Sequence, residues 1–415
     1  MTTTAERPAR TLDSRLQGTR PQRPRDFPLP SGRPDPLAHL TPEQVEHIGR
    51  ELDRLHDEVM ASLGADDAAY IRRVIRVQRS LEFGGRLTLL FSRWTPAWVA
   101  GTVALSLAKC LENMEIGHNV LHGQWDWMRD PRIHSQNWEW DHPSPAKQWQ
   151  AGHNEGHHTY TNVLDMDNDL GYGVLRVDEE QPWTLGTLAQ PLVNVGNALV
   201  FEYGIAAYDM ELGAYLKGEL PKEVFLPRLR AVLKKVGRQA AKDYVVTPLL
   251  SGPGWKRTLA ATWTANTVRN VWTNQVIMCG HFPDGVETFA TDSIEGETRG
   301  EWYLRQMVGS ANISGSRLMH IMTGHLSYQI EHHLFPDMPS NRYAQVAPRV
   351  RELMEQHGLT YVTGPLPRQV ANVQLKVLRL SLPPREPDRS RLRIVADAVR
   401  ETLGRARGGA APGTA

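Results

Sequence analysis

The chain has 415 residues, with 47 Lys and Arg against 46 Asp and Glu, so its formal net charge is only +1. This balance gives no electrostatic case for nucleic-acid binding, which a basic patch or stripe would indicate. Only two cysteines are present, Cys110 and Cys279, and each lies in an apolar stretch. They fit buried reduced thiols better than a disulfide, and they cannot supply the four thiolates of an ordinary iron–sulfur cluster.

The first part of the chain predicts a tail followed by a soluble helix. Residues 1–36 are rich in Arg, Pro and Thr and contain no apolar run, so we expect a disordered tail rather than a signal peptide. Thr41 and Gln44 then have the spacing of a capping box. Apolar residues recur at helical spacing as far as residue 63, which predicts an amphipathic helix over residues 42–63.

Half of the chain's 16 histidines are gathered in three short stretches. These boxes contain His118 and His122, then His153, His157 and His158, and finally His325, Gln329, His332 and His333. Neutral imidazole ligates first-row transition metals, and histidines four residues apart on a helix point to one face. We therefore expect each of the first two His-x-x-x-His pairs to hold one metal ion. His158 lies about 100° further round the helix than His157, where it can reach a second ion.

A rival metal chemistry uses some of the same residues. A lone histidine is usually a surface or hydrogen-bonded core residue, but three clusters favour a pair of metal ions. Glu115-x-x-His118 and Glu155-x-x-His158 also match the pattern by which ferritin-like bundles build a carboxylate di-iron site. The prolines between them break the long helices that such a bundle needs, and five of the histidines stay unexplained. We expect Glu115 and Glu155 instead to accept hydrogen bonds from ligand N–H groups.

Three strings carry a resemblance to a known family: GHNVLHG at His118, GHNEGHHTYTN at His153 and QIEHHLFP at Gln329. In order and separation they resemble the membrane-type fatty acid desaturase and hydroxylase family over residues 80–345, and they read most like its actinobacterial acyl-CoA desaturases. The resemblance implies a histidine-held non-haem di-iron centre that uses O2 and two electrons to remove two hydrogens from an acyl chain. It also implies a ligand between the second and third boxes, for which His281 is the candidate. The implied ligands are His118, His122, His153, His157, His158, His281, His332 and His333.

The third box departs from the commoner family pattern, because Gln329 stands where most members have histidine. An amide is a poor iron ligand beside imidazole, so we expect Gln329 to hold a metal-bound water or a neighbouring ligand. His325, four residues earlier, is either a ninth ligand or a hydrogen-bond donor behind the ligands. The front-end desaturases share this glutamine and commonly carry a fused cytochrome b5 domain marked by HPGG. Here the nearest string begins at His142 and reads HPSP, so that fusion is absent.

No other motif supplies a redox group. Asp165, Asp167 and Asp169 begin like a calcium loop, but Leu170 and Arg176 stand where that loop needs Gly and Glu. We interpret this stretch as a polar loop at the mouth of the site. The sequence contains no Walker loop, zincin string or G-x-G-x-x-G fingerprint, so electrons must come from outside. The resemblance implies an NADPH-linked reductase with an iron–sulfur centre, or a ferredoxin, that docks near basic residues of the catalytic cap.

Membrane association is expected, although its sequence signal is weaker than the metal signal. A spanning helix needs about 20 apolar residues, whereas the apolar runs at 94–108, 183–201 and 258–283 are short or interrupted by polar side chains. Trp125, Trp127, Trp138, Trp140 and Trp149 cluster beside the first two boxes. They form either an aromatic belt at the headgroup level or an aromatic core around the site. Residues 390–404 predict an amphipathic helix that either lies on a membrane or packs on the protein.

We expect an all-α protein in which membrane-associated helices lie beneath a cytosolic helical cap that holds the di-iron site. The desaturase domain covers residues 37–375, and residues 376–415 form a C-terminal helix and flexible tail. The expected activity is O2-dependent introduction of a cis double bond into an acyl chain carried by CoA, with two iron ions as cofactor. A hydroxylase of an alkyl chain or small lipophile is the enzymatic alternative, and a metal-storage or sensing protein is the non-catalytic one. The expected location is the cell membrane, with the catalytic face toward the cytoplasm.

Overall fold

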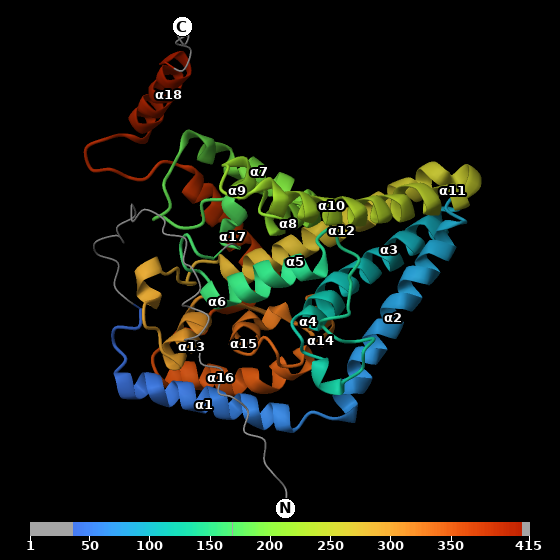
Figure 1. The fold of residues 1–415 in the computed structure, drawn as a ribbon, viewed down its shortest axis with the longest axis horizontal. Helices are drawn as coiled ribbons and strands as arrows, with labels where there is room; N and C mark the ends of the chain where they lie inside the picture. Colours follow the sequence, from blue (N-terminus) through green and yellow to red (C-terminus); the bar gives the residue numbers. More distant parts are fainter. Residues whose placement is uncertain (1–35, 168, 409–415) are drawn as a thin grey trace, which may run out of the picture. The chain divides into compact units, whose positions relative to one another are not determined.

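The described part of the chain is mainly helical with very little strand, as the sequence predicts (Figure 1). The computed structural model describes residues 36–167 and 169–408, with side chains as far as residue 403. The predicted tail over residues 1–36 therefore lies outside the described residues, apart from Pro36.

The α-helices are α1 (Pro42–Ala61), α2 (Ala65–Leu89), α3 (Thr95–Leu111), α4 (Asn119–Leu121), α5 (Ala146–Gln150), α6 (His158–Tyr160), α7 (Gln190–Leu199), α8 (Phe201–Asp209), α9 (Leu212–Leu216), α10 (Lys222–Ala240), α11 (Thr247–Leu250), α12 (Trp255–His281), α13 (Arg299–Val308), α14 (Arg317–Met322), α15 (Gln329–Leu334), α16 (Tyr343–Gln356), α17 (Leu366–Ser381) and α18 (Arg391–Gly408). Three segments are π-helical: η2 (Glu112–His118), η4 (Ala151–His157) and η7 (Ala241–Val246). Short 3-10 turns are η3 (Asp126–Met128), η5 (Gly171–Gly173), η6 (Leu185–Ala189), η8 (Gly252–Gly254), η9 (Thr291–Ile294), η10 (Leu326–Tyr328) and η11 (Ser340–Arg342).

The helix predicted near the N-terminus is confirmed as α1, which packs with α13, α15 and α16 around one core. Its capping box forms as expected, with the Thr41 side chain and the Gln44 side chain each bonded to the other residue's backbone N–H. The predicted apolar stripe is buried through Ile48, Leu52 and Val59. Because this core also encloses the apolar residues of α15, it fixes the helix that carries the third histidine box.

A second group of long helices is formed by α2, α3 and α12, with α3 packed against both of the others. The contact between α2 and α3 is close because glycines face it. A Cβ added to Gly101 would lie 2.7 Å from Leu89 Cγ and 3.0 Å from the Gly85 carbonyl oxygen. A larger residue at position 101 would therefore push α2 away from α3, whose C-terminal end leads directly into the first histidine box.

A single pair of parallel strands ties the third box to the rest of the fold. β1 (Asn312–Ser314) pairs with β2 (Thr363–Pro365), with Asn312 opposite Thr363. The Asn312 side chain accepts a hydrogen bond from Ile330 N at the start of α15 and donates one to Glu331. The short sheet thus orients the first turn of α15.

Two of the three apolar runs noted in the sequence lie mainly in single helices, and the third does not. Runs 94–108 and 258–283 become α3 and α12, but run 183–201 is split between η6 and α7 and ends where the backbone leaves helical geometry at Val200. Among the helices of the described residues, none combines the length and the apolar composition needed to cross a bilayer.

Three of the five clustered tryptophans, Trp125, Trp140 and Trp149, are buried, which favours the aromatic core over the headgroup belt for these residues.

Candidate metal centre

The first histidine box lies where α3 changes from α-helical to π-helical geometry. The seven residues of η2 end at His118, and α4 then leads to His122. A π-helical turn bonds residue i to i+5 and is frequent at functional sites. The two imidazole rings lie 4.6 Å apart, in contact with each other. The structure therefore brings this His-x-x-x-His pair to one place, as the sequence predicts.

The second and third boxes meet the first from other directions. η4 ends at His157 and α6 begins at His158, while α15 carries His332 and His333. His281 is the last residue of α12. All five of these side chains are buried.

Candidate ligand atoms that lie within 4.8 Å of one another form two groups made of histidines alone and a third group that joins His153 and His157 with Asp169. The first group is His118, His122, His153 and His332, and the second is His157, His281 and His333. His158 lies between them, with its ring 4.7 Å from that of His122 and 4.4 Å from that of His333. All eight candidate ligands of the sequence analysis are thus gathered in one region.

His153 and His157 belong to different all-histidine groups, but they also lie together in the group with Asp169, so the expectation that they share one ion stays a prediction. The seven residues of η4 have π-helical instead of α-helical geometry, and four residues do not complete a turn when residue i bonds to i+5. The rings of His153 and His157 stack 5.1 Å apart.

Unpartnered nitrogens test whether these groups fit metal ions. Within residues 36–167 and 169–403, these buried ring nitrogens have no hydrogen-bond partner: Nε2 of His122, His153, His332 and His333, Nδ1 of His281, and both nitrogens of His158. A buried polar atom without a partner is costly. A bound metal ion would satisfy one nitrogen of each of these rings, so the residues fit a two-metal site.

The opposite nitrogens of the same rings have partners that fix the tautomer. His157 Nδ1 donates to Asp167 at 2.9 Å and His153 Nδ1 donates to Asp169 at 3.1 Å. His333 Nδ1 donates to the Gln306 amide oxygen. An imidazole protonated on Nδ1 keeps its Nε2 lone pair free, and metal-binding histidines usually have such a partner on the other nitrogen.

Tyr343 acts in the same way on the third box. Its hydroxyl donates to the Phe335 carbonyl, so it accepts the N–H of His332 Nδ1, which lies 3.1 Å away. The sequence patterns singled out neither Tyr343 nor Gln306, because neither stands at a motif spacing. Asp167 and Asp169 belong to the polar loop that the sequence analysis placed at the mouth of the site, and they instead hold two histidines directly.

Trp149 closes the first group from one side. Its ring stacks on His153 with centroids 4.4 Å apart, and it contacts His118 and His122 at 5.3 and 5.4 Å. The tryptophan therefore limits the rotation of three histidine rings at once.

Burial keeps nearly all of these rings neutral, which is the form that binds metal. It lowers the pKa of His118 to about 4, and it lowers the pKa of His122, His153, His158, His281, His332 and His333 well below the ordinary range. His157 is the exception. Burial again acts to lower its pKa, but the carboxylates of Asp167 and Asp169 outweigh burial and raise it.

Gln329 lies at the second group. Its Nε2 atom is 2.9 Å from Nε2 of His281, and its Oε1 atom has no partner among the described side chains. The amide thus touches a candidate ligand, as expected for a residue that holds a ligand or a metal-bound water. The Gln329 side chain packs closely on Gly280, where an added Cβ would lie only 2.9 Å from it.

Three other candidates lie away from both groups. His325 has a left-handed backbone with φ of 55°, and its Nδ1 pairs with Glu115 at 2.9 Å. Glu115 also accepts hydrogen bonds from Tyr70 and Ser340. Glu115 thus accepts from His325, itself a possible ligand, so the expectation that Glu115 accepts from a ligand N–H stays a prediction. Glu155 is solvent-exposed, so its side chain does not have the inward position that we expected.

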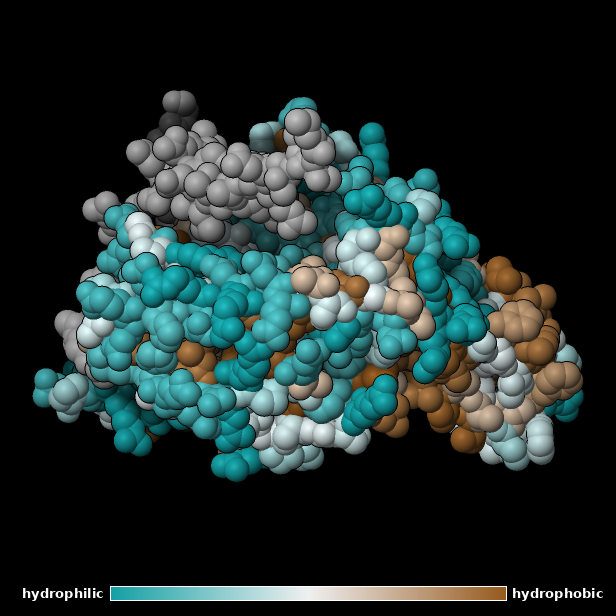
Figure 2. Space-filling model, turned by 90° about the horizontal axis from the view of Figure 1, so that it is seen from below, coloured by the Kyte–Doolittle hydropathy of each residue, from teal (hydrophilic) through white to brown (hydrophobic). Residues whose placement is uncertain are grey.

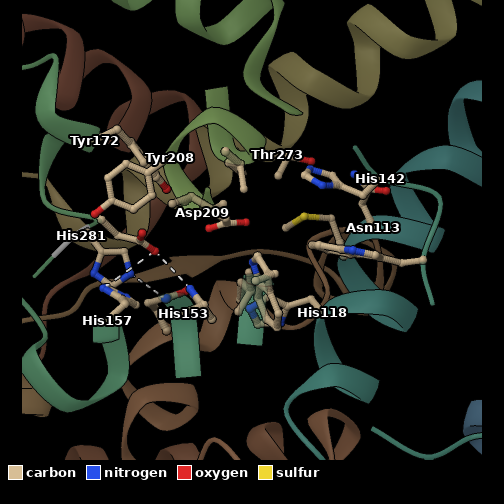
Figure 3. Close-up of a pocket in the computed structure, with 18 residues that line it drawn as sticks. Asn113, His118, His142, His153, His157, Tyr172, Tyr208, Asp209, Thr273 and His281 are labelled. Carbon is tan, nitrogen blue, oxygen red and sulfur yellow. Dashed lines mark hydrogen bonds and ion pairs between the residues drawn. The ribbon is translucent and has the colours of Figure 1, made fainter. Parts of the chain in front are cut away.

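A pocket lies against both histidine groups (Figure 3). His118 and His153 of the first group and His157 and His281 of the second line it. Met114, Ile205, Ile277 and Leu326 supply an apolar lining, and Gln329 also reaches it. A ligand in this pocket would therefore contact residues of both groups at the same time.

Comparisons with known proteins agree with this geometry. Residues 92–365 match the family model described as fatty acid desaturase. The NADPH-dependent stearoyl-CoA 9-desaturase of Mycobacterium tuberculosis is 47% identical over 84% of this chain and 83% of its own length. The fatty acid desaturase 2-like protein FADS2B of Mus musculus is 27% identical over 53% of this chain and 43% of its own, and the sn-1 linoleoyl-lipid 6-desaturase of a Synechocystis species is 24% identical over 66% and 80%.

The first testable prediction separates the two ambiguous histidines. His158→Gln should lower the iron bound by purified protein, because both of its ring nitrogens are buried without a partner and its ring lies between the two groups. His325→Gln should keep the iron of the unmodified protein, because its imidazole pairs with Glu115 outside both groups. Iron is measured by mass spectrometry on protein whose helix content matches the unmodified chain. Loss of iron in His325→Gln, with retention in His158→Gln, would contradict this assignment.

A second prediction concerns pH. The pKa of His118 falls from 6.5 to about 4 in the folded chain, so the unfolded chain binds a proton between these pH values that the folded chain does not bind. The free energy of unfolding of metal-free protein should therefore fall as the pH drops from 6.5 toward 4. Denaturant unfolding in the presence of a chelator measures this fall, and His122→Gln should make it shallower. A metal-free protein that is equally stable throughout this range would disprove the neutral histidine cluster.

Proposed function

Because the chain belongs to the fatty acid desaturase family, we propose that it introduces a cis double bond into a long acyl chain carried as a CoA thioester. It is an oxygen-dependent oxidoreductase. The observation that carries the finer proposal is that two groups of histidines border the same pocket. The name of the mycobacterial relative, a stearoyl-CoA desaturase, supports the CoA carrier.

We infer that the two groups hold a pair of iron ions. His118, His122, His153 and His332 would hold one ion, and His157, His281 and His333 would hold the other, with His158 completing the second set. Such an iron pair, when bound, supplies the activation of O2. Imidazole ligands add no negative charge, and the carboxylates behind His153 and His157 strengthen those two donors.

The rest of the site positions the substrate, and the reaction balances when a partner supplies two electrons. Removal of one hydrogen from each of two neighbouring methylenes gives the alkene, and these two hydrogens, two electrons and two protons convert O2 into two waters. The apolar lining of Met114, Ile205, Ile277 and Leu326 can hold methylenes against the histidine groups and exclude water. The electrons require a partner, and the name of the NADPH-dependent relative supports an NADPH-linked reductase or a ferredoxin.

The third prediction tests this activity directly. Iron-loaded protein incubated with stearoyl-CoA, O2, NADPH and a flavoprotein reductase with its iron–sulfur centre should form a monoene, and omission of the reductase should stop turnover. Mass spectrometry identifies the product, and O2 uptake gives the rate. His332→Ala should remove activity, because it deletes a candidate ligand of the first group. A hydroxylated chain as the main product would favour the hydroxylase, and iron binding without O2 uptake would favour a storage protein.

We propose that the protein is bound to the cell membrane, with the histidine groups on the cytoplasmic side where NADPH is available. Support comes from large apolar side chains that are exposed on α2, α3, η7, α11 and α12, and from the segment that joins α2 to α3. They are Phe83, Leu87, Phe91, Trp94, Val99, Val103, Val245, Val246, Leu249, Leu250, Trp255 and Trp263. Figure 2 shows apolar side chains gathered at the right of the view. Exposed apolar patches of this kind mark interaction surfaces, including membrane surfaces.

The fourth prediction concerns this surface. The protein should sediment with phospholipid vesicles, and Phe91→Asp combined with Leu250→Asp should weaken binding, because each places a charge where apolar area would be buried. Val174→Asp is the matched control, since Val174 is exposed on a loop outside these elements. Unchanged sedimentation of the double variant would argue against an apolar attachment at this surface.

A further inference from the structure

The pocket beside the histidine groups has two chemically different ends. In Figure 3, Asn113, Thr273 and His142 lie on one side of the view, while Tyr172, Tyr208 and His281 lie on the other. The histidine groups border the stretch between them. An acyl chain has a polar end and an apolar end, so this difference can decide which way the chain lies.

Polar atoms at the first end have no partner. Asn113 and Thr273 are only 5% and 8% exposed, yet neither the Asn113 Oδ1 atom nor the Thr273 Oγ1 atom forms a hydrogen bond within the described part of the chain. Buried side-chain oxygens are normally paired. Both residues line the pocket, so a bound polar group can supply the missing partners.

His142 adds a donor to the same end. Its Nδ1 accepts a hydrogen bond from the backbone N–H of Ser144 at 3.1 Å, so the ring proton sits on Nε2. Burial, together with the positive charges of Arg269 and Lys235, lowers the pKa of His142 well below the ordinary range, so the ring is neutral. The ring is held in place by stacking on Trp140, with centroids 4.4 Å apart.

The carboxyl groups that line the pocket already have partners. Asp169 accepts from His153, and Asp209 accepts from the hydroxyl of Ser144. The Thr273 hydroxyl and the His142 N–H remain as donors, and Thr273 stands one helical turn after the fully buried cation of Arg269.

We propose that Asn113, His142 and Thr273 bind the polar end of the acyl thioester, so that the chain runs from them across the two histidine groups. His142 Nε2 and Thr273 Oγ donate to the thioester carbonyl oxygen, which has two lone pairs. Asn113 Oδ1 accepts from the amide N–H of the CoA arm beyond the sulfur. A phospholipid ester has no such amide, so this end distinguishes the two carriers. The inference rests on the proposed desaturation of an acyl-CoA.

The same helix sets the distance between the carbonyl and the reaction. Thr273 stands eight residues before His281 on α12, which is about 12 Å along a helix with a rise of 1.5 Å per residue. A C–C bond of about 1.5 Å and a bond angle near 111° give an extended chain a rise of about 1.25 Å per carbon. The histidine groups should therefore face carbons about nine or ten from the carbonyl.

The test compares stearoyl-CoA with its thioether analogue S-octadecyl-CoA, which lacks only the carbonyl oxygen. Dissociation constants for iron-loaded protein should favour the thioester by about 25-fold, and Thr273→Val or His142→Phe should each reduce this preference by about 5-fold, the usual effect of one hydrogen bond. Thr273→Ser keeps the hydroxyl and should keep the preference. Thr262→Val is the matched control, because its hydroxyl bonds to the Leu259 carbonyl on the same helix.

The product gives a second readout. Thr273→Val should spread the double bond over neighbouring positions, whereas Thr262→Val should form the single isomer of the unmodified protein. An equal preference for thioester over thioether in the unmodified chain, Thr273→Val and His142→Phe would overturn this inference while the desaturase activity stood. Failure of the unmodified protein to desaturate stearoyl-CoA would instead overturn the proposed function.

Discussion

The rest of the structure depends on one constraint, which is that a group of imidazole nitrogens is buried without a protein partner. Each such nitrogen in His122, His158 and His332 costs free energy unless something binds it. The surrounding side chains restrict the rotation of the rings but form no hydrogen bond with these nitrogens. Asp167, Gln306 and Tyr343 hold the opposite nitrogens, and Trp149 fills the space beside the first group. The protein therefore maintains an arrangement that only a bound ligand can make favourable.

This constraint explains why the helices around the site are short or irregular. A regular α-helix presents side chains on one face every three or four residues, but here histidines of one box serve two groups. The π-helical turns η2 and η4 change the angular spacing at the first and second boxes. Long helices then fix the segments from outside, since α3 leads into η2 and α12 ends at His281. Two of the three histidine boxes therefore contain π-helical geometry.

The sequence predicted the gathering of eight histidines because their boxes are local patterns that survive any arrangement of the helices. It did not predict that His153 lies with the first box while His157 lies with His281 and His333, because that depends on a local change of helix type that no spacing reveals. Tyr343 and Gln306 were missed since they approach from distant segments. Asp167 lay within a recognised polar stretch, and its contact with His157 depends on backbone turns at Asn162 and Asp165, both with positive φ. The prediction of α1 was correct because a capping box and an apolar stripe are also local patterns.

The position of His325 illustrates the same limit. Helical spacing would place it on the face of Gln329, but its backbone is left-handed and a 3-10 turn follows, so it points to Glu115 instead. By contrast, Thr273 and His281 lie on one uninterrupted helix, where the rise per residue fixes their separation. Distances set along a single helix change little when neighbouring loops move. A helix that carries both a polar contact for the substrate and a candidate metal ligand can therefore keep the reacting carbon in place even if the rest of the pocket adapts to different chains.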